Sequence, residues 1–333
     1  MLQYAVIADR QRAVCFILRQ LRELPDWSCA DGQRRLIESV VEAPLRREVR
    51  HGGIVLSVGM TVLCCAMKFA SPRTVEILLN FGASPERCCK GGLDSFMHAC
   101  VSGNLDCIEY WVCRFPKWNL NRVDKHGRCA LHLALNMQPR ALPIAKILLR
   151  AGSNVFNVDA NGRGLIFAVC DNEDSTPNLL KLVLEQMCRR ATFSEGSTGD
   201  AVNCEERTDK WLRQRMRALN FSETLNRRIR ARTRGKRARI FLAKCLYRFG
   251  VPLSARHRRL ALMSGATALH AAAARGDVRL VHKLLHYGAD PKIRTDVGMD
   301  ARAFCREMGP FPGVDALLAS WSSCTESAGS AEK

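Results

Sequence analysis

The 333-residue sequence lacks the motifs by which most enzymes and metal proteins are recognised. No two of its sixteen cysteines form a C-x-x-C pair, and the adjacent pairs at 64–65 and 88–89 do not have the spacing of zinc ligands. Gly235-Lys236 lacks the upstream glycine of a phosphate-binding loop, and no G-x-S-x-G nucleophile motif is present. We therefore expect no catalytic residue, no cofactor and no metal site.

Long hydrophobic runs are also missing. The longest uncharged run, Gly52–Met67, has sixteen residues and contains three glycines, so it is too short and too interrupted for a membrane span. Asp9 and Arg10 break the first apolar stretch, which argues against a secretory signal. We therefore expect no membrane span, and reduced cysteines in a protein of the cytoplasm, the nucleus or both.

Aromatic residues are few, and the apolar residues that are present follow a repeat. Aromatics make up 7% of the chain and hydrophobic residues 47%, a composition that suits thin helices packed closely side by side. Self-similarity at a fixed period indicates a repeat architecture. Glycines recur at intervals of 33 or 35 residues at Gly59, Gly92, Gly127 and Gly162, and again 33 residues apart at Gly265 and Gly298.

The segment Gly265–Pro291 shows the repeat best and reads GATALHAAAARGDVRLVHKLLHYGADP. It resembles the ankyrin pattern G-x-T-P-L-H-x-A-A-x-x-G followed by V-x-x-L-L-x-x-G-A-D, and departs from it at Ala268, where the family prefers proline. We expect Thr267 to cap the first helix and His270 to link neighbouring backbones. The resemblance implies an all-α ankyrin-repeat solenoid of helix-turn-helix units with short hairpin fingers, interrupted by a basic insertion.

The repeat phase divides the chain into segments of different expected structure. The match is strong in four repeats and weak elsewhere. The expected segments are a degenerate N-terminal capping repeat (1–21), a connector (22–58), ankyrin repeats (59–188), an insertion (189–226), a degenerate basic repeat (227–264), an ankyrin repeat with a C-terminal cap (265–321) and a disordered tail (322–333).

The resemblance also implies a binding surface, because ankyrin arrays present their fingertips and the inner faces of their first helices to partners. The fingertips lean positive, so we expect a protein partner with an acidic surface, the alternative being plain solubilising charge. We expect these charges to contribute little to stability. The fingertip positions are Lys90, Lys125, His126, Arg128 and Arg163, and the inner helix positions are Lys68, Phe69, Val101, Ser102, Asn136 and Met137.

Positive charge is concentrated in one segment. Residues 207–259 hold 18 Lys or Arg against two acidic residues, so they carry +16 of the formal net charge of +19. We expect the run 226–239 to lack packed structure, because Ile229 is its one large apolar residue. Eight of its fourteen residues are basic: Arg227, Arg228, Arg230, Arg232, Arg234, Lys236, Arg237 and Arg239.

This run has three functional interpretations besides a solvated loop. Clustered Lys and Arg in an exposed segment are typical of a nuclear-import signal. The same charge could bind nucleic acid or an anionic membrane surface through counterion release. Ile229, Arg234, Gly235 and Arg239 also resemble the calmodulin-binding pattern I-Q-x-x-x-R-G-x-x-x-R, with Arg230 where glutamine belongs.

The function that the sequence favours is a non-enzymatic adaptor or scaffold that holds a partner protein in a concave ankyrin groove. The main alternative is a nucleic-acid-associated or calmodulin-binding protein that uses residues 207–259. A substrate adaptor of a ubiquitin ligase is a further alternative, although no segment like a SOCS box or an F-box accompanies the repeats. Binding through the basic segment should fall steeply with salt, whereas a groove with an apolar centre should be less sensitive.

Overall fold

The structure of the protein is a computed structural model that describes residues 2–24, 28–46, 48–51, 54–137, 140–172, 174–194, 209–219, 221–230, 234–249, 251–252, 254–309 and 311–330. These residues are mainly helical, as the repeat pattern predicts, and form two compact units, Met1–Asn154 and Val155–Lys333. Within the described part of the chain, no helix has both the length and the apolar character needed to cross a bilayer.

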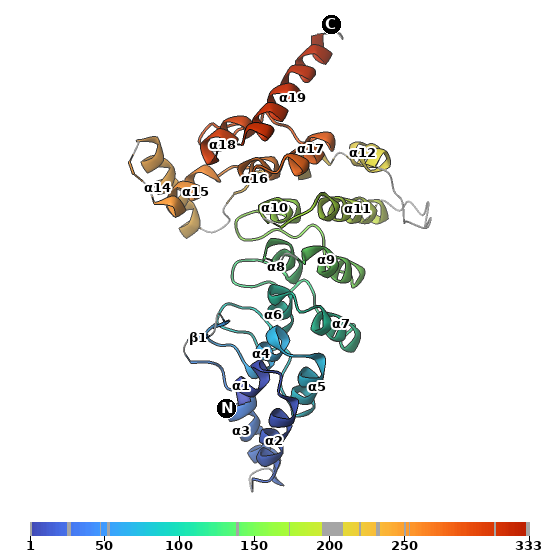
Figure 1. Cartoon of the computed structure of the whole chain (residues 1–333), viewed down its shortest axis with the longest axis vertical. Helices are drawn as coiled ribbons and strands as arrows, with labels where there is room; N and C mark the ends of the chain where they lie inside the picture. The colour runs from blue at the N-terminus through green and yellow to red at the C-terminus, as the bar shows by residue number, and fades with distance from the viewer. Residues whose placement is uncertain are drawn as a thin grey trace. The chain divides into compact units, whose positions relative to one another are not determined.

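The first unit is a stack of helix pairs (Figure 1). Helices α1, α4, α6 and α8 pack on one another in that order, and α2, α5, α7 and α9 follow in the same order beside them. Its elements are α1 (Leu2–Ile7), α2 (Gln11–Arg22), α3 (Ala30–Leu36), the π-helix η2 (Ile37–Val41), β1 (Val49–His51), β2 (Ile54–Leu56), α4 (Val62–Phe69), α5 (Pro72–Asn80), α6 (Ser95–Ser102), α7 (Leu105–Arg114), α8 (Ala130–Met137) and α9 (Ala141–Arg150).

The second helix of each pair buries the apolar residues that recur in the sequence. Leu78, Ile108 and Leu148, one from each of α5, α7 and α9, are 0% exposed. Trp111 is also fully buried, and its ring lies 4.7 Å from that of Phe115, measured between centroids. The apolar spacing along these helices thus places one face of each helix in a continuous core.

The connector 22–58 contributes α3, η2 and a hairpin of the antiparallel strands β1 and β2. Glu42, at the end of η2, fixes this connector to the loop after α5. Its carboxylate accepts a hydrogen bond from the Ser84 N–H (2.9 Å) and pairs with Arg87 (2.9 Å). The connector is therefore folded onto the helix pairs of its own unit.

The loops between repeats form hairpin fingers with one shared hydrogen-bond pattern. In the first unit the Asp124 N–H donates to the Arg128 carbonyl (3.0 Å), and the turn closes from Gly127 N–H to the Asp124 carbonyl (2.9 Å). Successive fingers are also joined, because the Lys125 N–H donates to the Gly91 carbonyl (3.1 Å). Each finger thus provides hydrogen-bond partners for polar groups of its own backbone and of the neighbouring finger's backbone.

The second unit contains another stack of helix pairs and the charged insertion. Helices α10, α16 and α18 pack in succession, and α11 packs against α17 and α17 against α19. Its elements are α10 (Leu165–Asp171), α11 (Pro177–Ser194), α12 (Asp209–Ala218), α13 (Ser222–Leu225), α14 (Arg234–Arg248), α15 (Ala255–Leu262), α16 (Ala268–Arg275), α17 (Val278–His286), α18 (Ala301–Met308) and α19 (Pro312–Ser330).

The pair α16–α17 shows the expected repeat chemistry. The Thr267 N–H donates to His270 Nδ1 (3.2 Å), so the other ring nitrogen, Nε2, carries the proton and donates to the Met299 carbonyl (3.2 Å). His270 thereby links its own helix start to the next finger. Gly288 ends α17 at a φ of 98°.

The segment between α11 and α16 does not add a repeat to this stack. Helix α10 packs directly against α16, whereas α14 and α15 pack mainly on each other and α12 packs on α11. This differs from the degenerate repeat expected over 227–264. A helix pair joins the stack only when it packs against the repeats before and after it. The face of α10 that such a pair would cover is already covered by α16.

The start of the basic run takes the place of a finger. The Ile229 N–H donates to the Ala266 carbonyl (2.9 Å), and the Gly265 N–H donates to the Ile229 carbonyl (3.1 Å). The backbone of Arg230 lies under Gly162, as that of Lys125 lies under Gly92. The backbone of residues 228–230 is therefore held in place, contrary to the expectation that the whole run 226–239 lacks packed structure. Backbone hydrogen bonds stabilise this segment, because it has little apolar side-chain area to bury.

The C-terminal helices close the stack. Asp315 of α19 pairs with Arg302 and Arg306 of α18, both at 2.8 Å. Together these pairs hold the pKa of the Asp315 carboxyl at about 2. Helix α19 continues to Ser330, beyond the cap boundary expected at residue 321 and into the tail 322–333 that was expected to be disordered.

We predict different costs for alanine at two glycines of the first unit. At Gly152 (φ 99°) a Cβ would meet no heavy atom within 4 Å, so Gly152→Ala should cost only the backbone strain of about 1–2 kcal/mol. At Gly59 (φ 86°) the Cβ would lie 2.5 Å from the Lys90 backbone nitrogen, so Gly59→Ala should cost clearly more. Denaturant unfolding of both variants measures this difference, and equal losses would contradict the close contact between fingers.

Candidate functional site

The predicted inner positions lie at the ends of three neighbouring helices of the first unit. Lys68 and Phe69 end α4, Val101 and Ser102 end α6, and Asn136 lies one residue before the end of α8. Since α4 packs on α6 and α6 on α8, stacking brings these positions, 33 to 35 residues apart in sequence, into one row. All five side chains are half-buried. The Met137 side chain lies outside the described residues.

The row contains a cation beside a buried histidine. Burial lowers the pKa of Lys68, whose Nζ lies 5.0 Å from the centre of the Phe69 ring. His98 of α6 is 5% exposed, and its burial, with the nearby Lys68 charge, lowers the pKa of the imidazole to about 4. His98 is therefore neutral at pH 7. Its Nε2 atom has no hydrogen-bond partner within the described chain, which leaves an unsatisfied polar atom in this part of the first unit.

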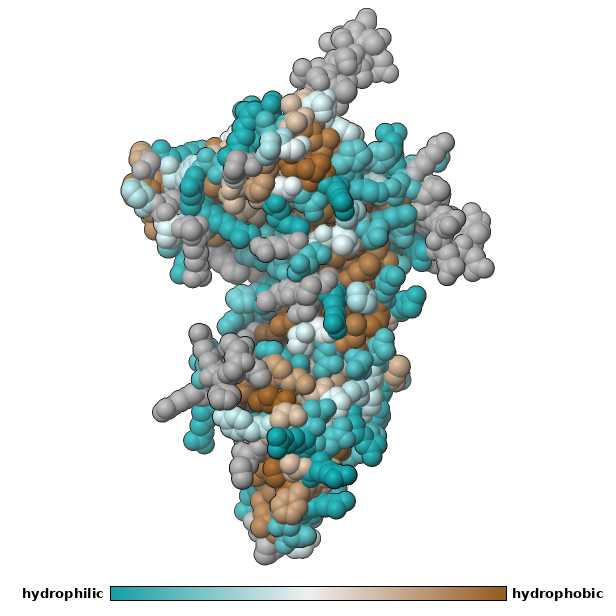
Figure 2. Space-filling view, viewed as in Figure 1, coloured by the Kyte–Doolittle hydropathy of each residue, from teal (hydrophilic) through white to brown (hydrophobic). Residues whose placement is uncertain are grey.

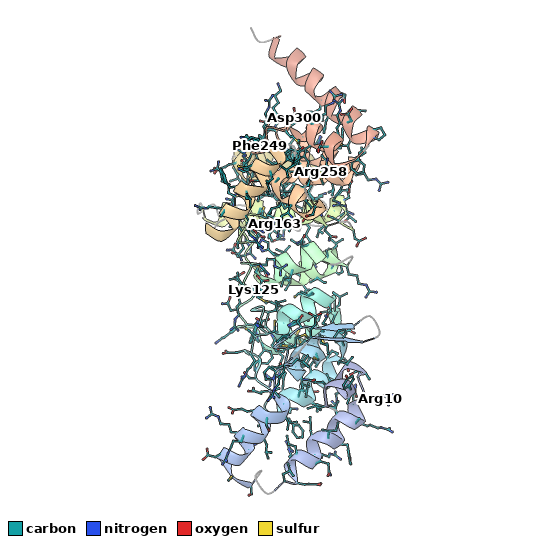
Figure 3. The ribbon with its side chains drawn as sticks, turned by 90° about the vertical axis from the view of Figure 1, so that its left-hand side faces the viewer. Arg10, Lys125, Arg163, Phe249, Arg258 and Asp300 are labelled. Carbon is teal, nitrogen blue, oxygen red and sulfur yellow. The ribbon has the colours of Figure 1, made fainter. Side chains whose placement is uncertain are left out.

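The fingertip residues fall into two groups. Lys90, Lys125 and His126 are exposed on the fingers of the first unit, and Lys125 is labelled in Figure 3. A partner can reach these side chains without disturbing the core, and their role as a contact surface stays a prediction. Arg128 and Arg163 belong to the second group, because each is held by its own finger.

Arg128 forms a tight ion pair with an aspartate that the sequence interpretation missed. Asp124 Oδ2 accepts hydrogen bonds from Arg128 Nη2 (2.7 Å) and Nε (2.9 Å), and the Asp124 side chain is 0% exposed. Asp159 and Arg163 repeat the arrangement in the second unit, with a shortest distance of 2.8 Å. These arginines stabilise the finger turn. The signal that could have shown this was an Asp and an Arg four residues apart, recurring with a period of 35 residues.

The basic run is divided between anchored and exposed side chains. Arg228 donates to the Gly265 carbonyl (3.1 Å) and pairs with Asp296 (2.8 Å). Arg227 lines a small pocket in the second unit, and Arg230 contributes its backbone to the contact with Gly162.

The rest of the run continues into α14. Arg237 and Arg239 are exposed on this helix. Arg232, and the side chains of Arg234 and Lys236, lie outside the described residues.

The calmodulin-like pattern does not form one helix. Ile229 is 8% exposed and precedes α14, which starts at Arg234 and carries Gly235 and Arg239. A calmodulin target inserts the apolar face of a continuous helix. The Ile229 side chain is instead buried in the second unit, so this geometry does not support the calmodulin interpretation.

Helix α14 has a feature that the sequence interpretation missed. Among its side chains from 237 to 248, only Ala243 is buried. Phe241 is 67% exposed and Leu242 is 60% exposed, and Phe249, just after the helix, is 83% exposed. In Figure 2 hydrophobic atoms appear at the surface where α14 lies in the view of Figure 1. The density of basic residues concealed this apolar character in the sequence.

The cysteines of the described chain are free thiols, many of them in the core. Burial raises the pKa of Cys65, Cys107 and Cys170 to about 12 each, so these thiols stay protonated at neutral pH and are poor nucleophiles. Among the described residues, no group of three or more His, Cys, Asp or Glu side chains is arranged to hold a metal ion.

Comparison with known proteins identifies the repeats. The family model "Ankyrin repeats (3 copies)" matches residues 62–159, and the model "Ankyrin repeat" matches residues 264–296. The fold is similar to the crystal structure of the ankyrin repeat domain of Bcl-3, described as a unique member of the IkappaB protein family. The TM-score is 0.51, with 18% identity, over 96% of this chain and 97% of that chain. No curated protein sequence matches the chain.

We predict that Arg128→Ala lowers the free energy of unfolding by roughly 2–4 kcal/mol, because it leaves the buried Asp124 carboxylate without its charge partner. Two backbone N–H groups, of His126 and Arg128, still serve this carboxylate, which limits the loss. The control is Lys125→Ala, an exposed position in the same finger, which should change stability by less than about 0.5 kcal/mol. Urea denaturation measures both, and an unchanged midpoint for Arg128→Ala would show that the ion pair does not stabilise the finger.

Proposed function

The chain is an ankyrin-repeat protein, and we propose that it acts as a non-enzymatic adaptor that binds a partner protein. The contact surface in this proposal is the row of inner positions on α4, α6 and α8 together with the exposed fingertips of the first unit. The observation that carries it is the alignment of Lys68-Phe69, Val101-Ser102 and Asn136 on three stacked helices. Regularly spaced side chains on a rigid stack suit recognition of a partner surface.

The partner that this surface suits is acidic. Lys68, Lys90 and Lys125 supply positive charge, and Phe69 and Val101 supply apolar contact between them. Electrostatic complementarity of this kind directs partners and sets specificity, while the apolar positions supply affinity. We place the protein in the cytoplasm or the nucleus, because its many protonated, buried thiols suit a reducing compartment.

Affinity capture with the full-length chain tests this proposal. We predict that Lys90→Glu with Lys125→Glu removes a defined set of captured proteins, because two attractive charges become repulsive. Capture after nuclease treatment excludes proteins bridged by nucleic acid.

The matched control is Lys117→Glu with Lys146→Glu, which makes the same charge change at two exposed positions outside the fingers and inner row. These proteins should stay bound to the control chain. If both variants lose the captured proteins, the change in net charge alone explains the loss. If both variants retain them, the partner binds elsewhere on the chain.

A further inference from the structure

Two polar side chains of α14, Lys244 and Tyr247, face the protein, whereas large apolar side chains of the same helix are exposed to solvent. Lys244 pairs with Asp296 (3.3 Å), and the Tyr247 hydroxyl donates to the Glu307 carboxylate (3.0 Å). Leu242, by contrast, is 60% exposed. Amphipathic helices of soluble proteins normally have the opposite arrangement. The polar contacts hold α14 in place on the second unit and leave its apolar face uncovered by the described chain.

A cavity of about 860 Å³ lies beside this face. Its apolar lining comes from α14, α15 and Ile229, and includes Leu242, Leu246, Leu260 and Met263, the residue that follows α15. The volume is within the range of about 300–1,000 Å³ that ligand pockets occupy. It can therefore take in bulky side chains of a partner.

The apolar surface continues beyond the cavity. Phe249 and Val251 follow α14 directly and are 83% and 43% exposed. Figure 3 looks at the molecule from this side and labels Phe249, which directly follows α14, and Arg258, which lies within α15. Large apolar side chains exposed close together along the chain are typical of an interaction site.

The cavity is also positively charged. Arg163, Arg239 and Arg259 line it, and Asp171 is the acidic residue in its lining. Asp171 pairs with Arg259 (3.0 Å) and Arg163 (3.6 Å). Arg239 is exposed and forms no ion pair within the described residues. An occupant therefore meets apolar walls bordered by uncompensated positive charge.

We propose that the α14–α15 cavity is a second docking surface of this protein, and that its occupant is an acidic amphipathic segment of a partner protein. Bulky apolar side chains of that segment enter the cavity, and carboxylates beside them pair with Arg239 and Arg259. This site goes beyond the proposed function, since it shares no residue with the inner row or fingertips of the first unit.

Shape and charge favour this occupant over others. A concave cavity admits separate side chains, which a flat bilayer surface does not offer. Nucleic acid would use polar and charged walls, whereas most of the surface area that this lining exposes is apolar. A second copy of the chain would bring the same dense positive charge to the contact, and like charges oppose association.

Fluorescence anisotropy with the full chain tests the proposal. The probe is a labelled synthetic peptide whose helical form places Leu or Phe at i, i+4 and i+7 among glutamates. We expect saturable binding that Leu242→Ser with Leu260→Ser weakens by about tenfold or more, because two apolar contacts are lost. Arg239→Ala should also weaken binding and reduce its dependence on salt.

The matched control is Phe241→Ser, on the same helix and equally exposed but outside the cavity lining, which should change affinity by less than about twofold. All replaced residues are solvent-accessible, and circular dichroism confirms that each variant is folded. A chain with Lys90→Glu and Lys125→Glu should bind the peptide normally, which separates this site from the groove.

Several results would overturn the proposal. These are no saturable binding, equal binding of a scrambled peptide, or equal losses for the cavity variant and the Phe241→Ser control. Two further results would identify a different occupant. One is co-flotation with phosphatidylserine vesicles that depends on Leu242 and Leu260, and the other is self-association in sedimentation that the same variant abolishes.

Discussion

The hairpin fingers approach one another closely, and the rest of the structure depends on that approach. A turn glycine at positive φ lies directly against the backbone of the next finger, so that a Cβ at Gly59 would meet the Lys90 nitrogen at 2.5 Å. Any side chain at this point would separate the fingers and break the hydrogen bonds that join them. Because the fingers set the spacing of the repeats, they also set how closely the first helices pack, and with it the row of inner positions.

The same constraint explains how the chain accommodates a long charged insertion. Gly162 needs a backbone segment beneath it, and Arg230 supplies one, although the helix pair α10–α11 after Gly162 leads into the insertion and not directly into another repeat. Once Ile229 is bonded to Gly265 and Ala266, α10 and α16 can pack on each other. The inserted helices then remain outside the stack, where α14 and α15 are free to form a surface of their own.

The sequence predicts the regular parts of this fold well. Gly265, Thr267 and His270 stand at fixed spacing, and each has a local role that does not depend on distant residues. Hydrophobic periodicity likewise identifies the buried face of the second helix of each repeat, because the same apolar spacing recurs from repeat to repeat. The all-helical stack follows from these local rules.

The insertion and part of the candidate site could not be predicted in this way. Whether residues 227–264 join the stack depends on which helix covers α10, a long-range packing choice that no local pattern encodes. Arg128 looks like a free fingertip charge in sequence, and its role becomes clear only when Asp124 is seen to be buried beneath it. In α14, Lys244 and Tyr247 face protein because Asp296 and Glu307, more than fifty residues away, attract them.

Two surfaces with different chemistry thus lie on one repeat scaffold. In the first unit, the inner row and fingertips combine lysines with a few apolar contacts. In the second, the α14–α15 cavity is mainly apolar with arginines at its border. Our two proposals assign an acidic partner to each surface, and the cavity is the one assigned a segment with bulky side chains.

Hydrogen exchange of individual amides, followed by NMR under native conditions, tests most directly whether the basic run is anchored as a finger. The Ile229 N–H donates to the Ala266 carbonyl (2.9 Å) and the Gly265 N–H to the Ile229 carbonyl (3.1 Å), while Asp296 N–H makes the regular finger bond to the Ser264 carbonyl (2.9 Å). We predict that Ile229 and Gly265 are protected to a similar degree as Asp296. Exchange of Ile229 at the rate of an unstructured chain, with Asp296 still protected, would contradict the account.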